Sequence, residues 1–309
     1  MKFLYFTDSH LRDDCPKNRI DDFYKTQFKK LYEIGEIASK ENCNFLLSGG
    51  DTFDIYHVSD KLKYDFISWQ KNIKLPIVTI IGSHDMLAKN DKAIGYTSIG
   101  VLINAGIIQE LSNSEYSQYI TGYNYSDDLP IELICNTEKD YKIVVCHNMI
   151  TPNMTFPFKT ISIDKVKTNA DLVLLGHWHP PFTGNVGNTM FVNPGSMTRL
   201  TSSISDMERN IQVVIVDIDK KSYKMVTLGS AKSFSEVFDL KSIEEEKEII
   251  QNTKKYKEFF SSIKTLNLEQ ADDFQTIMSS YGKQLNISSD IVEKSIEELT
   301  NAKLEGKHI

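Results

Sequence analysis

The chain of 309 residues lacks a long apolar run, and it has only 4 cysteines and 8 prolines. A membrane-spanning helix needs about 18 or more apolar residues in succession. The apolar segment at residues 3–6 is also too short for the core of a signal peptide. The cysteines show no paired spacing, so we expect buried, reduced thiols rather than disulfides or a zinc knuckle. These absences predict a soluble, cytoplasmic protein with no membrane partner.

An excess of positive charge is missing as well, because the formal net charge is -7. Proteins that bind nucleic acid phosphates are usually basic, so this charge argues against such a partner. The argument is not decisive, since bound metal ions add local positive charge that a count of side chains ignores. With 40% hydrophobic residues, the chain can bury a large core, and its length suits one large domain with an appendage.

Strand-like and helix-like segments alternate in the first half of the chain. We predict strands at residues 2–7, 44–48 and 77–81, and helices at residues 21–40 and from a cap at Ser59 or Asp60 to just before Pro76. Such strand-to-helix units favour parallel strands that are buried on both faces. Further strands are expected at residues 141–146, 171–175, 190–192, 212–218 and 223–228. We expect an α/β fold in which the last three form a mostly antiparallel edge of a second sheet.

Residues 231–309 read as a separate helical module, because strand patterns end and charged, amphipathic segments follow. Three apolar stripes with helical spacing are expected there: Ile249, Tyr256, Phe260 and Ile263; Phe274, Ile277, Met278 and Tyr281; Val292, Ile296 and Leu299. Asp290 with Glu293 resembles a capping box for the last helix. Three short helices after a complete domain favour a docking role over self-packing.

Carboxylates and imidazoles follow the predicted strands with unusual regularity. The set comprises Asp8, His10, Asp51, His84, His147, His177 and His179. Of the 7 histidines in the chain, only His57 and His308 lie outside it. A single histidine is more often a structural or surface residue than a ligand. Scattered structural histidines would not be expected to follow strand ends so consistently, so the set predicts a metal site.

Nitrogen and carboxylate ligands without thiolate suit manganese, iron or zinc, and the set exceeds what one ion would use. Two ions roughly 3.5–4 Å apart lower the pKa of a bridging water and clamp the oxygens of a phosphoryl centre. The predicted arrangement places Asp51 between the ions, Asp8, His10 and His179 on the first, and His147 and His177 on the second.

His84 is assigned as a general acid that protonates the leaving oxygen of a phosphoester. Asp85, the next residue, is expected to hydrogen-bond to His84 and set its tautomer. The alternative is that His84 is a further metal ligand.

In this order the motifs resemble those of calcineurin-like metallophosphoesterases: Asp8-Ser9-His10, Gly50-Asp51, Gly82-Ser83-His84-Asp85, His147 and Gly176-His177-Trp178-His179. The match spans about residues 1–200. The resemblance implies a four-layer αββα sandwich of two mixed sheets over residues 1–230, followed by the C-terminal helical module. It also implies two divalent metal ions, most readily manganese.

Two further segments are similar to the SbcD-type DNA repair nucleases of bacteria and phages: Phe53-Asp54 and residues 194–199, Pro-Gly-Ser-Met-Thr-Arg. This resemblance implies exonuclease and endonuclease activity on DNA in a bacterial cell or a phage-infected host. It further implies a homodimer whose C-terminal helices bind an SbcC-like coiled-coil ATPase. Asp54 and Arg199 are expected to bind substrate. The alternative for residues 194–199 is a turn with a solvated arginine.

One position departs from the family pattern, because Ser83 stands where the family has a metal-binding asparagine. A hydroxyl is a shorter and poorer neutral ligand than an amide oxygen, so Ser83 predicts weaker binding of the second ion.

Two other functions stay open. The same site would serve a phosphodiesterase or phosphatase that acts on a small molecule. A third possibility is a regulatory subunit that binds DNA ends and whose catalysis has weakened through Ser83.

Overall fold

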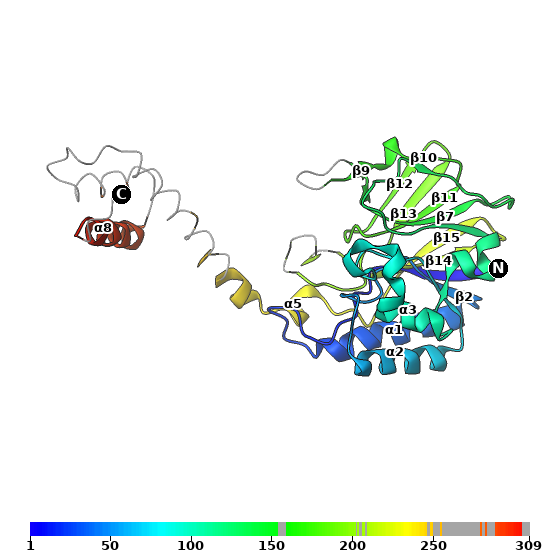
Figure 1. Cartoon of the computed structure of the whole chain (residues 1–309), viewed down its shortest axis with the longest axis horizontal. Coiled ribbons are helices and arrows are strands. Elements are labelled where there is room, and N and C mark those ends of the chain that lie inside the picture. The colour runs from blue at the N-terminus through cyan, green and yellow to red at the C-terminus, as the bar shows by residue number, and fades with distance from the viewer. Residues whose placement is uncertain are drawn as a thin grey trace. The chain divides into compact units, whose positions relative to one another are not determined.

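The computed structural model describes residues 1–153, 159–201, 203, 206–207, 209–245, 248–249, 254, 279, 282 and 288–304 (Figure 1). The chain divides into two compact units, Met1–Phe238 and Asp239–Ile309. The first unit contains two mixed sheets with flanking helices, which confirms the predicted α/β class. Within the described ranges, no helix is both long enough and apolar enough to cross a membrane.

The first sheet has six strands, in the order β15 (Ser222–Thr227), β14 (Gln212–Asp217), β1 (Lys2–Phe6), β2 (Phe45–Ser48), β3 (Ile77–Thr79) and β4 (Gln109–Glu110). Strands β1 to β4 pair in parallel, as their continuous apolar sequences predict. β14 pairs antiparallel with β1, and β15 pairs antiparallel with β14. The expectation that β14 and β15 belong to the second sheet is therefore wrong. A hairpin pattern predicts that two strands pair with each other, but not which sheet edge they join.

The second sheet has five strands, in the order β12 (Phe182–Val186), β13 (Thr189–Asn193), β11 (Leu172–Gly176), β7 (Ile143–His147) and β5 (Ile120–Tyr123). Only β12 is antiparallel to its neighbour. Two small sheets lie beside it, formed by β6 (Glu132–Leu133) with β10 (Lys167–Thr168) and by β8 (Ile150–Thr151) with β9 (Ile161–Ser162).

Alternation along β1 shows how the layers are built. Phe3 and Tyr5 face the core between the two sheets, whereas Leu4 and Phe6 face the helices. The helical layer consists of α1 (Phe23–Lys40), α2 (Asp60–Ile73) and α3 (Ser98–Asn104), which lie together on one side of the first sheet (Figure 1). Ser59 caps α2 by accepting a hydrogen bond from Leu62 N, as predicted.

The outer face of the second sheet is covered differently. Ile150 of β8 and Ile163 of the 3-10 helix η5 (Ile163–Lys165) pack with Val144 of β7 and Val173 of β11. In the described residues, short strands and a single 3-10 turn form this outer layer. Residues 97–129 hold α3, β4, β5 and the 3-10 helices η3 (Leu111–Asn113) and η4 (Glu115–Gln118). The helices η1 (Leu87–Lys89) and η2 (Asp91–Tyr96) precede them.

The C-terminal segment contributes α5 (Phe234–Val237) to the first unit and α8 (Ser289–Leu304) to the second. The predicted boundary after residue 230 stays a prediction. Of the three expected apolar stripes, the first two fall mainly outside the described residues. Val292 of the third is buried on α8. Asp290 lies within the first turn of α8 rather than before it, so it is not the cap residue that the sequence suggested.

Candidate metal centre

Five loops bring the predicted residues together beyond the carboxyl ends of β1, β2, β3, β7 and β11. Backbone hydrogen bonds join the first two loops: Asp8 N donates to Gly50 O at 3.1 Å, and His10 N donates to Asp51 O at 3.0 Å. The Asp8 carboxylate accepts a hydrogen bond from His177 N at 3.0 Å. Asp8, His10, Asp51 and His177 have φ angles of 52°, 42°, 50° and 79°. Side-chain-bearing residues rarely adopt this region, and such strain tends to occur at functional sites.

Close packing of these loops depends on glycine. A Cβ atom on Gly82 would lie 2.1 Å from Asp51 Oδ1 and 2.3 Å from Asp51 N. A Cβ atom on Gly176 would lie 2.3 Å from Thr7 Oγ1. Gly82 therefore allows the close approach of Asp51, and Gly176 allows that of Thr7.

Replacing Gly82 by alanine is expected to displace Asp51, because the new methyl group overlaps its backbone and carboxylate. Overpacking of this kind costs about 1–3 kcal/mol of stability, and divalent metal binding should weaken with it. Gly95→Ala is the matched control, since a Cβ there meets nothing within 4 Å. Thermal unfolding and a manganese titration measure both effects. Unchanged metal affinity in Gly82→Ala would contradict this role of the glycine.

The first cluster consists of Asp8, His10 and His179, whose ligand atoms lie within 4.8 Å of one another. The Nε2 atoms of His10 and His179 are 3.1 Å apart, and each lies 3.7 Å from Asp8 Oδ1. Two imidazole nitrogens and a carboxylate oxygen thus converge on one point, which is the donor set of a divalent cation.

The second cluster consists of Asp51, His147 and His177, again within 4.8 Å. His147 Nδ1 donates to Gly49 O at 2.6 Å, which leaves Nε2 unprotonated in the neutral ring and directed into the cluster. Nε2 lies 3.1 Å from Asp51 Oδ2 but without hydrogen-bond geometry, and it is one of the buried polar atoms without a partner. A buried acceptor of this kind fits a metal ligand.

Asp51 lies between the two clusters. Its Oδ2 atom is 3.1 Å from His147 Nε2 and 3.8 Å from His10 Nε2. This is the position that a bridging carboxylate requires, and the clusters divide the residues in the same way as the predicted partition. The residues present therefore fit two divalent ions. When bound, such ions supply Lewis-acid activation of a phosphoester and of the attacking water.

Without bound ions, the carboxylates and imidazoles of the two clusters shift one another's pKa values. Burial lowers the pKa of His10, but the Asp54 and Asp8 carboxylates outweigh it and raise that pKa to about 10. Burial of His147 is likewise outweighed by Asp51, and its pKa rises to about 9. The Asp51 pKa is lowered far below its usual range despite burial, mainly by His147. Cations must therefore displace protons from these imidazoles in order to bind.

Asp54, predicted to bind substrate, lies behind His10. Its Oδ1 atom is 3.2 Å from His10 Nδ1, an ion-pair distance without hydrogen-bond geometry, and its Oδ2 atom is 2.9 Å from Arg12 Nη1. A carboxylate on the far nitrogen of an imidazole fixes ring orientation and increases ligand basicity. The structure therefore gives Asp54 an orienting position, and substrate binding by Asp54 stays a prediction.

His84 is exposed at the edge of the site and faces His10, with ring centroids 4.7 Å apart. Its Nδ1 atom donates to the backbone carbonyl of Asp54 at 2.5 Å. Asp85 is not its partner, which corrects the sequence interpretation. The buried Asp85 carboxylate accepts from Gly82 N and Asp51 N, both at 2.9 Å, and from Thr52 N at 3.1 Å. Asp85 thus holds the loop that carries Asp51.

Since Nδ1 is bonded to the Asp54 carbonyl, His84 Nε2 is the ring nitrogen left for the predicted general acid. His10, Asp51 and His84 also form a third group of possible ligands, so the ligand alternative stays open. The catalytic assignment of His84 remains a prediction.

Ser83 lies beside the second cluster. Its Oγ atom is 3.3 Å from Asp51 Oδ2 and 3.5 Å from His177 Nδ1. The hydroxyl therefore occupies the neighbourhood that a second-ion ligand would occupy, and its role as a weak ligand stays a prediction.

Restoring the family's amide in Ser83→Asn is expected to tighten binding of the second ion by roughly 10-fold, since even changes in residues that only orient metal ligands alter metal affinity by about 10–100-fold. Manganese titration of wild type and variant by calorimetry measures the effect. Ser114→Asn, at a buried serine away from the site, is the control. Equal manganese affinities in Ser83→Asn and wild type would show that position 83 does not ligate.

Arg199, the other predicted substrate ligand, is buried rather than solvated. Its guanidinium donates to the backbone carbonyls of Asp206, Arg209 and Lys232 at 2.7–2.8 Å. The alternative of a turn with a solvated arginine is therefore wrong. These bonds give Arg199 a structural position, and contact with a DNA phosphate stays a prediction.

Two residues at the site had no sequence signal. The Tyr125 ring lies 5.1 Å from that of His177, and Lys89 Nζ donates to Tyr125 Oη at 3.1 Å and to Asp127 at 2.8 Å. Tyr125 follows β5 and Lys89 ends the 3-10 helix η1, both outside any motif, so only the fold brings Tyr125, with Lys89 bonded to it, to the second cluster.

Comparisons with known proteins identify one family and several similar solved structures. The family model of the calcineurin-like phosphoesterase superfamily domain matches residues 1–221. Similar solved structures include an archaeal phosphodiesterase, with 18% identity, coverage of 74% of this chain and 100% of that chain, and a TM-score of 0.37. The protein TT1561 of Thermus thermophilus has 11% identity and a TM-score of 0.41, and the match covers 73% of this chain and 98% of that chain. The phosphoesterase Yfce of E. coli has 11% identity and a TM-score of 0.37, and the match covers 74% of this chain and 100% of that chain.

The identities and TM-scores of these structures are low, so the assignment rests on the family match, which covers well over half of the chain. Three clusters of possible metal ligands at the strand ends accord with it. The chain belongs to the calcineurin-like phosphoesterase superfamily, whose members hydrolyse phosphoester bonds.

Proposed function

We propose that the chain is a manganese-dependent DNA nuclease of the SbcD type, and the catalytic subunit of a DNA repair and recombination complex. The observation that carries the proposal concerns residues 194–199, the segment similar to SbcD-type nucleases. Ser196 Oγ donates to Asp8 O at 2.9 Å, and Thr198 Oγ1 donates to Ser9 O at 2.7 Å. This segment therefore fixes the backbone at Asp8, a residue of the first cluster.

The exposure of His84 supports the proposed cleavage of a large substrate. Its side chain is exposed, so a polymer can reach it, and the Asp54 carbonyl holds Nδ1–H in place. In the imidazolium form, the proton on Nε2 can transfer to the leaving oxygen of a phosphodiester, while Nδ1–H stays hydrogen-bonded to the Asp54 carbonyl. General acid catalysis of this kind contributes about 10²- to 10⁴-fold in rate.

Digestion of linear duplex DNA tests the proposal. With manganese we expect shortened strands, and none after addition of a chelator. A small diester, bis(p-nitrophenyl) phosphate, is the parallel substrate. Hydrolysis of the small diester without any cleavage of DNA would favour the small-molecule phosphodiesterase. Binding of DNA ends with neither hydrolysis would favour the regulatory subunit.

The proposed partner is an SbcC-like coiled-coil ATPase, bound by the C-terminal helices, and the proposed oligomer is a homodimer. Support comes from the separate second unit after Phe238 and from the amphipathic α8, on which Val292 is buried and Glu293 is exposed. The full chain is mixed with such an ATPase and analysed by light scattering after gel filtration. A variant that ends at Phe238 should keep hydrolysis and lose the complex. A complex that survives this truncation would place the docking surface elsewhere.

A further inference from the structure

The loop at residues 196–199 is held by cationic side chains on the side away from the metal centre. All four of its residues are buried, and the backbone carbonyl of each accepts a hydrogen bond from a lysine or an arginine. The bonds run from Arg209 to Ser196 O and Thr198 O, from Lys30 to Met197 O, and from Arg19 to Arg199 O.

The other side of this loop bonds to the first metal cluster. Ser196 N donates to His179 O at 3.0 Å, and Met197 N donates to Asp8 O at 3.2 Å. Ser196 Oγ also donates to Asp8 O, at 2.9 Å. Asp8 and His179 are two of the three residues of the first cluster. The loop therefore connects the cationic side chains to the backbone of two expected metal ligands.

Asp8 requires such support, because its φ angle of 52° lies in a region that side-chain-bearing residues rarely adopt. The irregular loop that supports it does not satisfy its own buried carbonyls, so these need donors from elsewhere. Hydrogen bonds from charged donors are roughly twice as strong as those between neutral groups. Lysine and arginine donors thus fix the loop more firmly than neutral side chains could.

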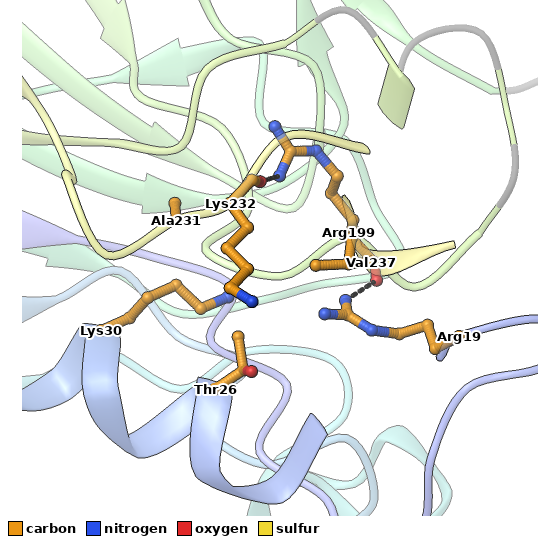
Figure 2. A pocket seen from close by; sticks show the side chains of 7 residues that line it. All are labelled: Arg19, Thr26, Lys30, Arg199, Ala231, Lys232 and Val237. Atoms are coloured by element: carbon orange, nitrogen blue, oxygen red, sulfur yellow. Dashed lines mark hydrogen bonds between the residues drawn. The ribbon is translucent and has the colours of Figure 1, made fainter. Parts of the chain in front are cut away.

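The burial of these charges also calls for a function. Lys30 and Arg209 have relative exposures of 3% and 6%, and a buried charge is costly. The cavity beside Lys30 and Arg199 has room for no more than a water molecule, so a bound ligand does not explain the charges. Figure 2 shows Lys30 extending from α1 and Arg19 bonded to the carbonyl of Arg199.

We propose that Lys30 and Arg209 are positioning residues for the first metal ion. They hold residues 196–199, and this loop in turn fixes the backbone of Asp8 and His179. The inference concerns the metal centre and does not depend on the proposed nuclease function.

The second cluster is held by other groups. The Asp85 carboxylate accepts from Asp51 N at 2.9 Å, and Gly49 O accepts from His147 Nδ1 at 2.6 Å. Loss of a cation behind the loop should therefore weaken the first ion and spare the second.

Manganese titration of the full-length chain by calorimetry tests the proposal in two backgrounds. His177→Ala removes a ligand of the second cluster, and His179→Ala removes a ligand of the first, so each background reports on the other ion. Lys30→Met should lower manganese affinity by about 10-fold in the His177→Ala background. It should leave the affinity unchanged in the His179→Ala background. Lys29→Met, at an exposed neighbour on α1, should have no effect in either.

Thermal unfolding of the metal-free protein separates positioning from general stabilisation. Lys30→Met should melt no lower than wild type, because methionine fills a similar space and removes a buried charge. A lower melting temperature, an equal loss of affinity in both backgrounds, or no loss in the His177→Ala background would each overturn the proposal.

If Lys30→Met does not fold, Arg209→Lys decides. This variant keeps the charge, but its compact ammonium group cannot span the two carbonyls that the guanidinium fork bonds. Its loss of manganese affinity should again be confined to the His177→Ala background. Equal affinities of Arg209→Lys and its parent in that background would overturn the proposal.

Discussion

Replacement of His84 by alanine is expected to reduce phosphodiester hydrolysis by about 10²- to 10⁴-fold, while manganese binding is retained. The reason is geometric. His84 is exposed, its Nδ1 atom is held by Asp54 O at 2.5 Å, and it stands beside the two clusters that contain the predicted ligands. Loss of the imidazole removes the proton donor for the leaving oxygen and leaves Asp8, Asp51 and the other ligands in place.

Two measurements separate this role from ligation. Hydrolysis is followed with DNA and with bis(p-nitrophenyl) phosphate, whose nitrophenolate leaves without needing a proton, so the activity loss should be smaller on the second substrate. Manganese stoichiometry is measured by calorimetry. His57→Ala is the matched control, because His57 is an exposed histidine outside the set. If His84→Ala loses an ion together with activity, His84 is a ligand.

Replacement of Asp51 by asparagine is expected to have the larger effect, with hydrolysis reduced by at least ~10³-fold because metal activation supplies several kcal/mol. Asp51 Oδ2 faces both clusters, so the change removes the single negative charge that the two clusters share. Asparagine keeps the side-chain volume and an acceptor for His84 N, which donates to Asp51 Oδ1 at 2.8 Å.

The expected signature is weaker binding of both ions in a protein that stays folded. Metal content after dialysis and far-ultraviolet circular dichroism report on these two properties. Asp60→Asn, at an exposed position in the first turn of α2, is the control. A variant that keeps both ions and full activity would show that Asp51 does not bridge.

The layers of the fold were largely predictable because the strands carry a strong local signal. β1, β2, β7 and β11 are apolar on both faces, and each ends at a site residue or at most three residues before one. The sequence alone therefore predicts which side chains meet at one sheet edge. The placement of β14 was not predictable. It pairs with β1 across more than two hundred residues of sequence, and no local pattern encodes that choice.

Within the site, side chains next to strands were easier to predict than their hydrogen-bond partners. Asp85 follows His84 in sequence, yet its carboxylate turns toward Gly82 N, and His84 instead bonds to the Asp54 backbone. Arg199 was expected in solvent or on DNA, yet backbone carbonyls surround it. Backbone acceptors are present at every residue and leave no mark in a sequence, so these partners emerge only with the fold.

The central claim is that two divalent ions lie at the strand ends with Asp51 between them. Anomalous diffraction at the manganese edge, on crystals grown with manganese, tests it most directly. The account predicts two peaks, one surrounded by Asp8, His10 and His179 and one by His147 and His177, with Asp51 adjoining both. A single peak, or peaks away from these residues, would contradict it.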